Sequence, residues 1–191
     1  MLMVNQNEIQ ERIALFSQVN NVAVAFQNSN TKNKKMAAID FRDPEILSFF
    51  KSLEEYNVKF ILIGGFAMAF HGHVRATHDL DIWLKDSAEN IEKFIDVLKE
   101  HGVKGLNELR SFEMIPGFTQ FQIGDSGFVV EPLKSLKTLK EYDFDAAYGR
   151  AEHGSFGEVR FKVIHAKDLL KEKEATNRPK DQGDIEHLRS L

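Results

Sequence analysis

Apolar and polar positions along residues 38–191 follow two periods, one typical of helices and one typical of strands. Residues 46–53 place Ile, Leu and Phe side chains at helical spacing, after an Asp-Pro-Glu start at 43–45 that combines an N-cap acceptor with a first-turn proline. Residues 58–63 are a short apolar, β-branched run, which predicts a buried strand. Residues 65–70 then predict a short apolar helix that is broken at 71–73.

The rest of the chain continues this alternation of strands and helices. Strands are predicted at 78–84, around 118–123, at 127–130 and at 159–164, and helices at 87–101, at 138–148, at 166–175 and from Pro179 onward. The residues at 124–126 (Gly-Asp-Ser) are typical of a hairpin turn between two of these strands. This order predicts an α/β (α+β) fold, a mixed β-sheet flanked by helices.

The first 35 residues differ in character, being rich in Asn and Gln and ending in a polar, basic stretch. Ile9, Ile13 and Phe16 could line one face of a short helix, and residues 22–26 could form a short strand. We interpret residues 1–35 as a disordered or dispensable N-terminal extension, and residues 36–191 as the single domain.

Charge and composition exclude several classes of function. The formal net charge of −4 argues against an extended nucleic-acid-binding surface. The absence of cysteine excludes disulfides, thiolate metal sites and cysteine nucleophiles. No apolar run approaches the roughly 20 residues that span a bilayer, and the N-terminus does not resemble a secretory signal. We therefore expect a soluble, cytoplasmic protein with no membrane partner.

Two short motifs carry candidate chemistry. Gly64-Gly65 lies where a strand turns into a helix, so the backbone can approach an anion such as a triphosphate, although a tight turn alone would also use two glycines. Asp79 and Asp81 share one face of the next strand, where a divalent cation would relieve their repulsion. The alternative for this pair is an edge strand with a solvated acidic face.

Together, these motifs resemble the nucleotidyltransferase superfamily, which has a polymerase-β-like fold. In that superfamily a turn with the pattern hydrophobic-Gly-[Gly/Ser] precedes a strand with the pattern Asp-h-[Asp/Glu]-h, where h is hydrophobic. The chain looks like the small bacterial AbiEii-like or minimal branch, whose C-terminal pattern is similar to residues 163–170, Lys173, residues 178–181 and Asp184. The resemblance covers about residues 38–190.

The resemblance implies a site for Mg²⁺ or Mn²⁺ and a nucleoside triphosphate. Its third acidic ligand matches Glu131, a departure from the family's usual Asp, and the alternative for Glu131 is an exposed strand terminus. Pro132 marks the end or edge of this strand. The implied catalytic and metal-binding residues are Asp79, Asp81 and Glu131, and the implied nucleotide-binding residues are Gly64, Gly65, Arg75, Lys173 and Arg178.

Each cation in this set has an ordinary alternative. Arg75 could grip a phosphate through two N–H groups or be a surface-loop arginine. Lys173, Arg178 and Lys180 could offset triphosphate charge or lie at solvated helix ends, and Lys180 could pair with Asp184 one helical turn away.

Four aromatic residues near the motifs are given structural roles. His71, His73 and His78 are interpreted as hydrogen-bonding residues rather than zinc ligands. Trp83 has the parity of the two aspartates, so it could stack on a base, but a packed core tryptophan is the commoner arrangement.

The function that the resemblance implies is metal-dependent transfer of a nucleoside monophosphate from a triphosphate to an acceptor, with release of pyrophosphate. One carboxylate, most naturally Glu131, would help to deprotonate the acceptor. The acceptor stays open between a small molecule, whose pocket a homodimer could complete, and a partner protein. Alternatives are an antitoxin-type AMP transferase that modifies a partner protein and a non-catalytic nucleotide-binding or interaction module. A template-dependent polymerase or a modifier of transfer RNA ends is disfavoured, because the chain lacks a basic track.

Overall fold

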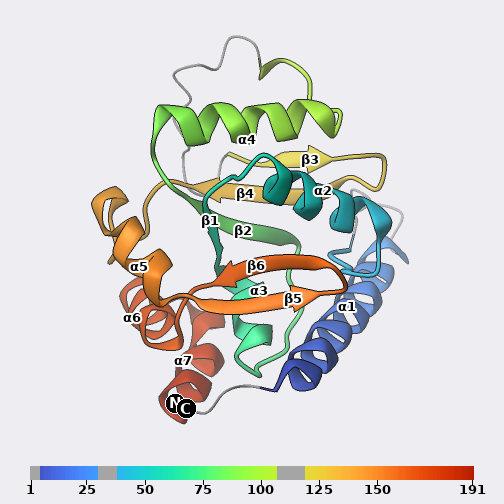
Figure 1. Cartoon of the computed structure of the whole chain (residues 1–191). Coiled ribbons are helices and arrows are strands. Elements are labelled where there is room, and N and C mark those ends of the chain that lie inside the picture. Colours follow the sequence, from blue (N-terminus) through green and yellow to red (C-terminus); the bar gives the residue numbers. More distant parts are fainter. Residues whose placement is uncertain (1–4, 30–37, 107–118) are drawn as a thin grey trace.

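A computed structural model of the chain describes residues 5–29, 38–106 and 119–191 (Figure 1). The helices are α1 (Gln6–Ser29), α2 (Pro44–Glu55), α3 (Gly64–Phe70), α4 (Ala88–Glu100), α5 (Phe144–Arg150), α6 (Ala166–Thr176) and α7 (Gln182–Arg189), with 3-10 turns η2 (Glu141–Asp143) and η3 (Pro179–Asp181). The strands are β1 (Phe60–Leu62), β2 (Asp79–Leu84), β3 (Phe121–Ile123), β4 (Phe128–Leu133), β5 (Glu152–Phe156) and β6 (Val159–Val163).

The six strands form one mixed sheet in the order β3-β4-β2-β1-β6-β5. β2 pairs with β4 and β1 with β6 in parallel, whereas the other three neighbouring pairs are antiparallel. Helices flank this sheet, with α2 and α4 on one side in Figure 1 and α5, α6 and α7 gathered at the opposite side. The predicted fold class, a mixed sheet flanked by helices, is confirmed, and it is consistent with a nucleotidyltransferase-type fold.

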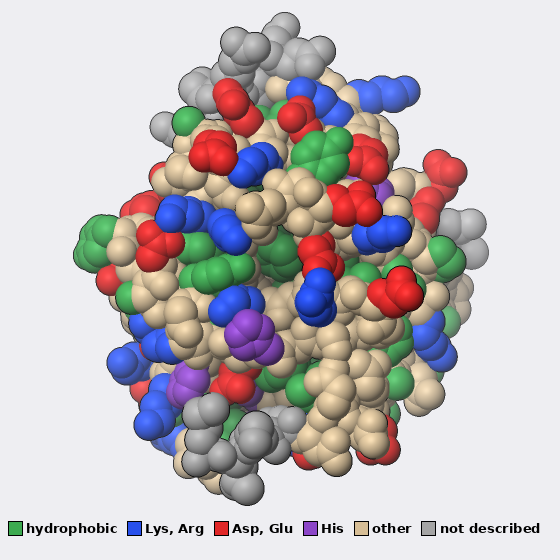
Figure 2. Space-filling model, in the orientation of Figure 1, with side chains coloured by type: hydrophobic (Ala, Val, Ile, Leu, Met, Phe, Trp, Pro, Cys, Tyr) green, Lys and Arg blue, Asp and Glu red, His purple; other side chains and the backbone are tan. Residues whose placement is uncertain are grey.

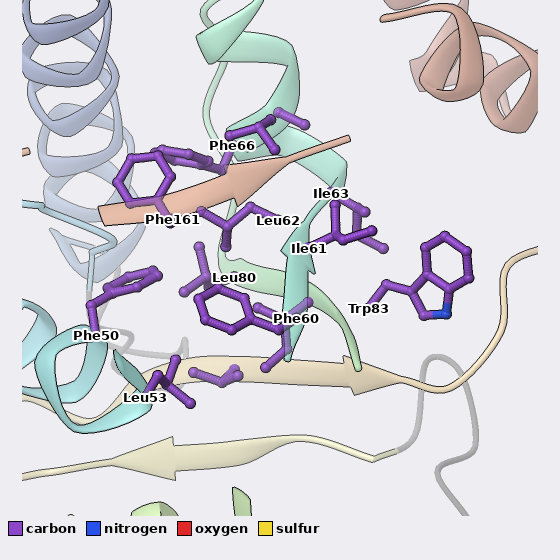
Figure 3. Close-up of a cluster of buried hydrophobic side chains, with 14 of the residues drawn as sticks. Phe50, Leu53, Phe60, Ile61, Leu62, Ile63, Phe66, Leu80, Trp83 and Phe161 are labelled. Carbon is purple, nitrogen blue, oxygen red and sulfur yellow. The ribbon is translucent and has the colours of Figure 1, made fainter. Parts of the chain in front are cut away.

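The alternation of side chains along β2 separates the aromatic core from the chemistry. Leu80 and Ile82 are fully buried and share a face with the phenylalanine cluster of α2, α3 and β6. Figure 3 shows Phe50, Phe66 and Phe161 gathered on this side, with Trp83 on the far side of β1. Asp79 and Asp81 have the parity of Trp83, so they project away from the phenylalanine cluster.

The N-terminal segment forms a long helix, which corrects part of the sequence prediction. Ile9, Ile13 and Phe16 line its buried face as predicted, but residues 22–26 continue α1 and are not a strand. The ring of Phe16 meets that of Phe66 edge-on at a centroid distance of 5.5 Å. Residues 6–29 therefore form a helix that packs one face into the core. From the sequence we interpret residues 1–35 as dispensable, whereas this packing predicts that deleting them lowers the melting temperature.

Local capping explains why the predicted helices begin where they do. Asp43 Oδ1 accepts a 2.8 Å hydrogen bond from the backbone N–H of Glu45 at the start of α2, and Ser87 Oγ accepts one of 3.3 Å from Asn90 at the start of α4. The helix predicted at 138–148 instead begins as the turn η2 and continues as α5 to Arg150. Strand β5 was not predicted, and part of the strand expected around 118–123 lies outside the described residues.

The surface carries both signs of charge. On the face shown in Figure 2, Lys and Arg side chains are interspersed with Asp and Glu. Among the described residues, no helix has the length and apolar character needed to cross a membrane.

Candidate functional site

A pocket of about 520 Å³ opens where β2, β4 and the start of α3 face α6 and η3. The sheet contributes three carboxylates, and the cations come from α6, from η3 with its N-cap residue and from loops. The apolar part of the lining comes from Leu133, Leu136, Ile164 and Leu169. Every site residue predicted from the sequence lines this pocket, so the structure brings the whole set into one place: Gly64, Gly65, Arg75, Asp79, Asp81, Glu131, Lys173 and Arg178.

The carboxylates of Asp79, Asp81 and Glu131 form a cluster because of strand register. Asp81 lies opposite Glu131 in the parallel β2–β4 pair, and Asp79 is two residues before Asp81 on the same face. Each side chain offers an oxygen, and these three oxygens lie within 4.8 Å of one another. β2 is an interior strand, so the alternative of a solvated edge strand for the two aspartates is wrong.

Glu131 is buried, with 8% of its surface exposed, which excludes the alternative of an exposed strand terminus. Its Oε2 accepts a 3.1 Å hydrogen bond from Gln120 Nε2. Pro132 follows within β4, opposite Ile82, in the part of the strand beyond the described pairing with β3. The proline therefore lies where its missing N–H removes no bond to β3.

Burial and neighbouring negative charge alter the acidity of Asp81. Burial, together with the neighbouring carboxylates of Asp79 and Glu131, raises the pKa of Asp81 to about 7, although Lys173 and Arg178 act in the opposite direction. Such a cluster is costly without a counterion. Three carboxylate oxygens at this spacing fit the ligand preference of Mg²⁺ or Mn²⁺, and the cluster does not distinguish between these ions.

Gly64 is required by the approach of Asp81. It has a φ of +62°, and a Cβ atom there would lie 1.7 Å from Asp81 Oδ2. At Gly65, a Cβ would lie 2.8 Å from the Cβ of Thr77. Ile63 precedes α3 without a side-chain cap, so no side chain of this N-cap covers the first N–H groups of the helix. The turn therefore does more than connect a strand to a helix, because its glycines let the backbone lie directly against the Asp81 carboxylate.

Thr77 contributes to the site although sequence reasoning assigned it no role. Its Oγ1 donates a 2.9 Å hydrogen bond to Asp79 Oδ1, which fixes the orientation of that carboxylate. Its backbone N–H is bonded to Asn20 of α1 at 2.8 Å. The short Thr-His-Asp spacing was visible in the sequence, but the contact with α1 could not be read from it.

Lys173 is buried and bonded to two carboxylates rather than lying at a solvated helix end. Its Nζ lies 2.9 Å from Asp181 Oδ1 and 2.8 Å from Asp184 Oδ2. Both aspartates are fully buried. Within the described chain Asp184 forms ion pairs with Lys173 and Arg75, and its Oδ1 lies 3.6 Å from His73 Nε2, so the alternative pairing of Lys180 with Asp184 is not formed.

The two arginines of the pocket are also held by these aspartates. Arg75 Nε and Nη2 each lie 3.0 Å from an oxygen of Asp184, so this edge of the guanidinium is occupied. Arg75 therefore cannot grip a phosphate through that edge, and its Nη1 also donates a 3.3 Å hydrogen bond to the carbonyl of Ala76, which further limits the predicted two-point contact. Arg178 Nε lies 2.7 Å from Asp181 Oδ2.

The aromatic residues near the motifs have structural contacts. His71 is buried and its Nε2 is bonded to the carbonyl of Ile164 at 2.8 Å, and burial lowers its pKa. Within the described residues, the group suited to a metal is the carboxylate cluster, without a histidine. Trp83 is fully buried against Phe144 and does not line the pocket, so it is a core residue.

Comparison with known families agrees with this geometry. The family model for aminoglycoside-2''-adenylyltransferase matches residues 45–116, a stretch that contains Gly64, Gly65, Asp79 and Asp81 but not Glu131. This match supports the nucleotidyltransferase superfamily. It covers less than half of the chain, and it does not confirm the AbiEii-like branch, which stays a resemblance. No curated protein matches the chain.

Proposed function

We propose that the protein is a metal-dependent nucleotidyltransferase that transfers a nucleoside monophosphate from a triphosphate to an acceptor and releases pyrophosphate. The observation that carries the proposal is the cluster of Asp79, Asp81 and Glu131 beside the Gly64-Gly65 turn in one pocket. The match to an adenylyltransferase family over the same turn and strand supports it.

The carboxylate cluster is proposed to hold Mg²⁺ or Mn²⁺. When bound, the ion supplies charge stabilisation for the attacking and leaving oxygens of the transfer. Asp79 is oriented for this role by Thr77, and Glu131 by Gln120. The Glu131 carboxylate is proposed to accept the proton of the attacking acceptor group.

The remaining residues are proposed to bind the triphosphate. Gly64 and Gly65 begin α3 beside the carboxylates, and the backbone N–H groups and positive end of a helix start favour phosphate oxygens. Arg75, Lys173 and Arg178 line the facing wall and offset the phosphate charge in a site partly closed from water. The apolar lining, which includes Leu133, Leu136 and Leu169, suits a base.

The donor is proposed to be ATP, because the matched family is named for adenylyl transfer. That family name also gives the first acceptor to test, an aminoglycoside. A partner protein is the second acceptor class, as in the antitoxin-type hypothesis. A non-catalytic nucleotide-binding module is the remaining alternative, and it would bind nucleotide without releasing pyrophosphate.

The test is calorimetric titration of ATP, GTP, CTP and UTP with Mg²⁺, together with a pyrophosphate-release assay over a panel of acceptors. The double variant Asp79→Asn/Asp81→Asn removes two ligands while keeping side-chain size. Asp145→Asn is the control, since the side chain of this aspartate is 75% exposed and pairs with Lys85 away from the pocket. Binding that needs Mg²⁺ and is lost only in the double variant supports the site, and full activity in that variant would refute it.

A further inference from the structure

We infer that two buried aspartates outside the carboxylate cluster, Asp181 and Asp184, are positioning residues that hold the cationic wall of the pocket ready for a triphosphate. The inference rests on the proposed function, because it concerns how the same pocket binds phosphate. Neither aspartate lines the pocket, so each acts through the cations that it touches.

The contacts join parts of the chain that lie far apart in sequence. Asp184 of α7 bonds Arg75, which lies in the connection between α3 and β2, and Lys173 of α6. Asp181 of η3 bonds Lys173 and Arg178, and it accepts a further 3.2 Å bond from Thr176 Oγ1. Lys173 therefore bridges the two aspartates, and the three cations form one connected wall.

Charge counting indicates that this wall is built for an anion. Within the ion-pair network, three cations, Arg75, Lys173 and Arg178, meet two carboxylates, Asp181 and Asp184, which leaves one net positive charge. Two further cations and one carboxylate line the pocket outside this network, namely Lys137, Lys180 and Glu172. The cations hold the pKa of both carboxyl groups below the usual range, so both stay ionised at neutral pH. The excess positive charge faces a pocket in which phosphates would lie.

Stability alone gives little reason for such a network. Burying charged groups costs desolvation free energy, and apolar residues of similar volume are often as stabilising as a buried ion pair. What the network does achieve is fixed geometry. Because the guanidinium is planar, holding the Nε–Nη2 edge of Arg75 on Asp184 also fixes the plane of its remaining N–H groups. Cations that are already ordered lose less entropy when they bind phosphate.

The test is calorimetric titration of inorganic tripolyphosphate, with Mg²⁺, into the full chain and into Asp184→Asn. The variant keeps the side-chain size but removes the charge that orients Arg75 and Lys173. We expect its Kd to rise roughly 10- to 100-fold, the range seen when outer partners of metal ligands are removed, because the lost orientation of Arg75 and Lys173 outweighs the net positive charge that the variant adds. The titration stoichiometry reports the folded fraction separately, so misfolding would lower the stoichiometry rather than the affinity.

The matched control is Glu174→Gln, which removes an acidic partner of Arg189 in another pair between α6 and α7. Arg189 Nη2 lies 2.7 Å from Glu174 Oε1, and neither residue lines the pocket. We expect its Kd to change by less than about twofold, as for an ordinary surface substitution. Equal affinity in Asp184→Asn and in the unmodified chain would overturn the inference.

Two further variants test the mechanism, and Arg75→Lys does so even if Asp184→Asn does not fold. Arg75→Lys keeps the charge but loses the two-bond edge, so tripolyphosphate binding should weaken, and unchanged binding would contradict a positioning role. In a double-mutant cycle, Arg75→Gln and Asp184→Asn together should weaken binding by clearly less than the product of their separate effects. Multiplicative effects would show that Asp184 does not act through Arg75.

Failure of the inference and failure of the proposed function give different results. If no nucleoside triphosphate releases pyrophosphate but tripolyphosphate binding depends on Asp184, the proposed transfer reaction is refuted and the positioning role of Asp184 is supported. If pyrophosphate is released but Asp184→Asn binds tripolyphosphate normally, the reaction stands and the positioning role is wrong. An unmodified chain that does not bind tripolyphosphate refutes the anion-binding wall directly.

Discussion

Asn20 Oδ1 accepts a 2.8 Å hydrogen bond from the backbone N–H of Thr77. Asn20 is fully buried in α1, and its Nδ2 also donates to the carbonyl of Ile39 at 3.1 Å. Since Thr77 in turn orients Asp79, the N-terminal helix is linked to the carboxylate cluster through two consecutive hydrogen bonds. The helix thus supports the site as well as the core.

Replacing Asn20 by Leu should destabilise the protein and disturb the site. The substitution leaves the Thr77 N–H and the Ile39 carbonyl without their buried partner, which costs about 1–3 kcal/mol for each unsatisfied group. Urea unfolding measures the loss. Gln18→Leu, on an exposed position of the same helix, is the control and should be nearly neutral. Equal stability of the two variants would mean that the Asn20 contacts contribute nothing.

Two phenylalanines of α1 should differ sharply when each is replaced by Ala. Phe16 is fully buried against Phe66, so its removal should cost about 3–5 kcal/mol of unfolding free energy. Phe26 is 83% exposed, and its removal should change stability by less than about 0.5 kcal/mol. Thermal melting of both variants and of a chain lacking residues 1–35 checks this. If the chain lacking residues 1–35 has the same melting temperature as the full chain, those residues are dispensable for folding.

Gly64→Ala should abolish nucleotide binding, because the new methyl group would displace the Asp81 carboxylate. The positive φ also strains any residue with a side chain. Gly157→Ala separates the two effects, since Gly157 has a φ of +58° but open space where the methyl group of alanine would lie. The control should lose some stability and retain Mg²⁺-dependent ATP binding. Intact binding in Gly64→Ala would contradict the close packing at this turn.

The stability of the metal-free protein should depend on pH through Asp81. Its pKa rises from 3.8 to about 7 on folding, so the folded state binds this proton more tightly. The stabilisation is complete below the unfolded pKa and is lost as the pH rises through about 7. In EDTA, the melting temperature of Asp81→Asn minus that of the parent should therefore increase from about pH 4 to about pH 8. A constant difference across that range would contradict the raised pKa.

Mg²⁺ supplies the complementary measurement. An ion bound by the three carboxylates should raise the melting temperature of the parent at neutral pH by mass action. Asp81→Asn should gain much less from the same addition, because it has lost one ligand and the repulsion that the ion relieves. An equal gain in both proteins would place the binding elsewhere.

The sequence pattern predicted those elements whose signals are local. The Asp43 cap, the β2 alternation and the Gly64-Gly65 turn all depend on neighbouring residues, and each was found as predicted. α1 was underestimated because its hydrophobic face is narrow and interrupted by Asn20, a polar residue whose buried partners are remote in sequence. β5 was missed because its sequence, Glu-His-Gly-Ser-Phe, lacks the usual strand composition, and pairing with β6 forms it.

The candidate site shows the same division. Asp79 and Asp81 could be placed on one face from strand parity alone, and the third carboxylate came from family resemblance. The partners of Lys173 could not be derived, because they depend on how α6, η3 and α7 fold against one another. Sequence spacing therefore located the residues, and only the tertiary structure revealed which of them are bonded to each other.

The register between β2 and β4 limits how the pocket can move during a catalytic cycle. Asp81 and Glu131 lie opposite each other on two interior strands, so the separation of their backbones is set by the spacing of the sheet. Changing it would require breaking ladder hydrogen bonds. The floor of the pocket is thus set by the sheet, and any closure around a substrate has to come from lining outside the sheet, which includes residues 135–137 as well as Lys173 and Arg178.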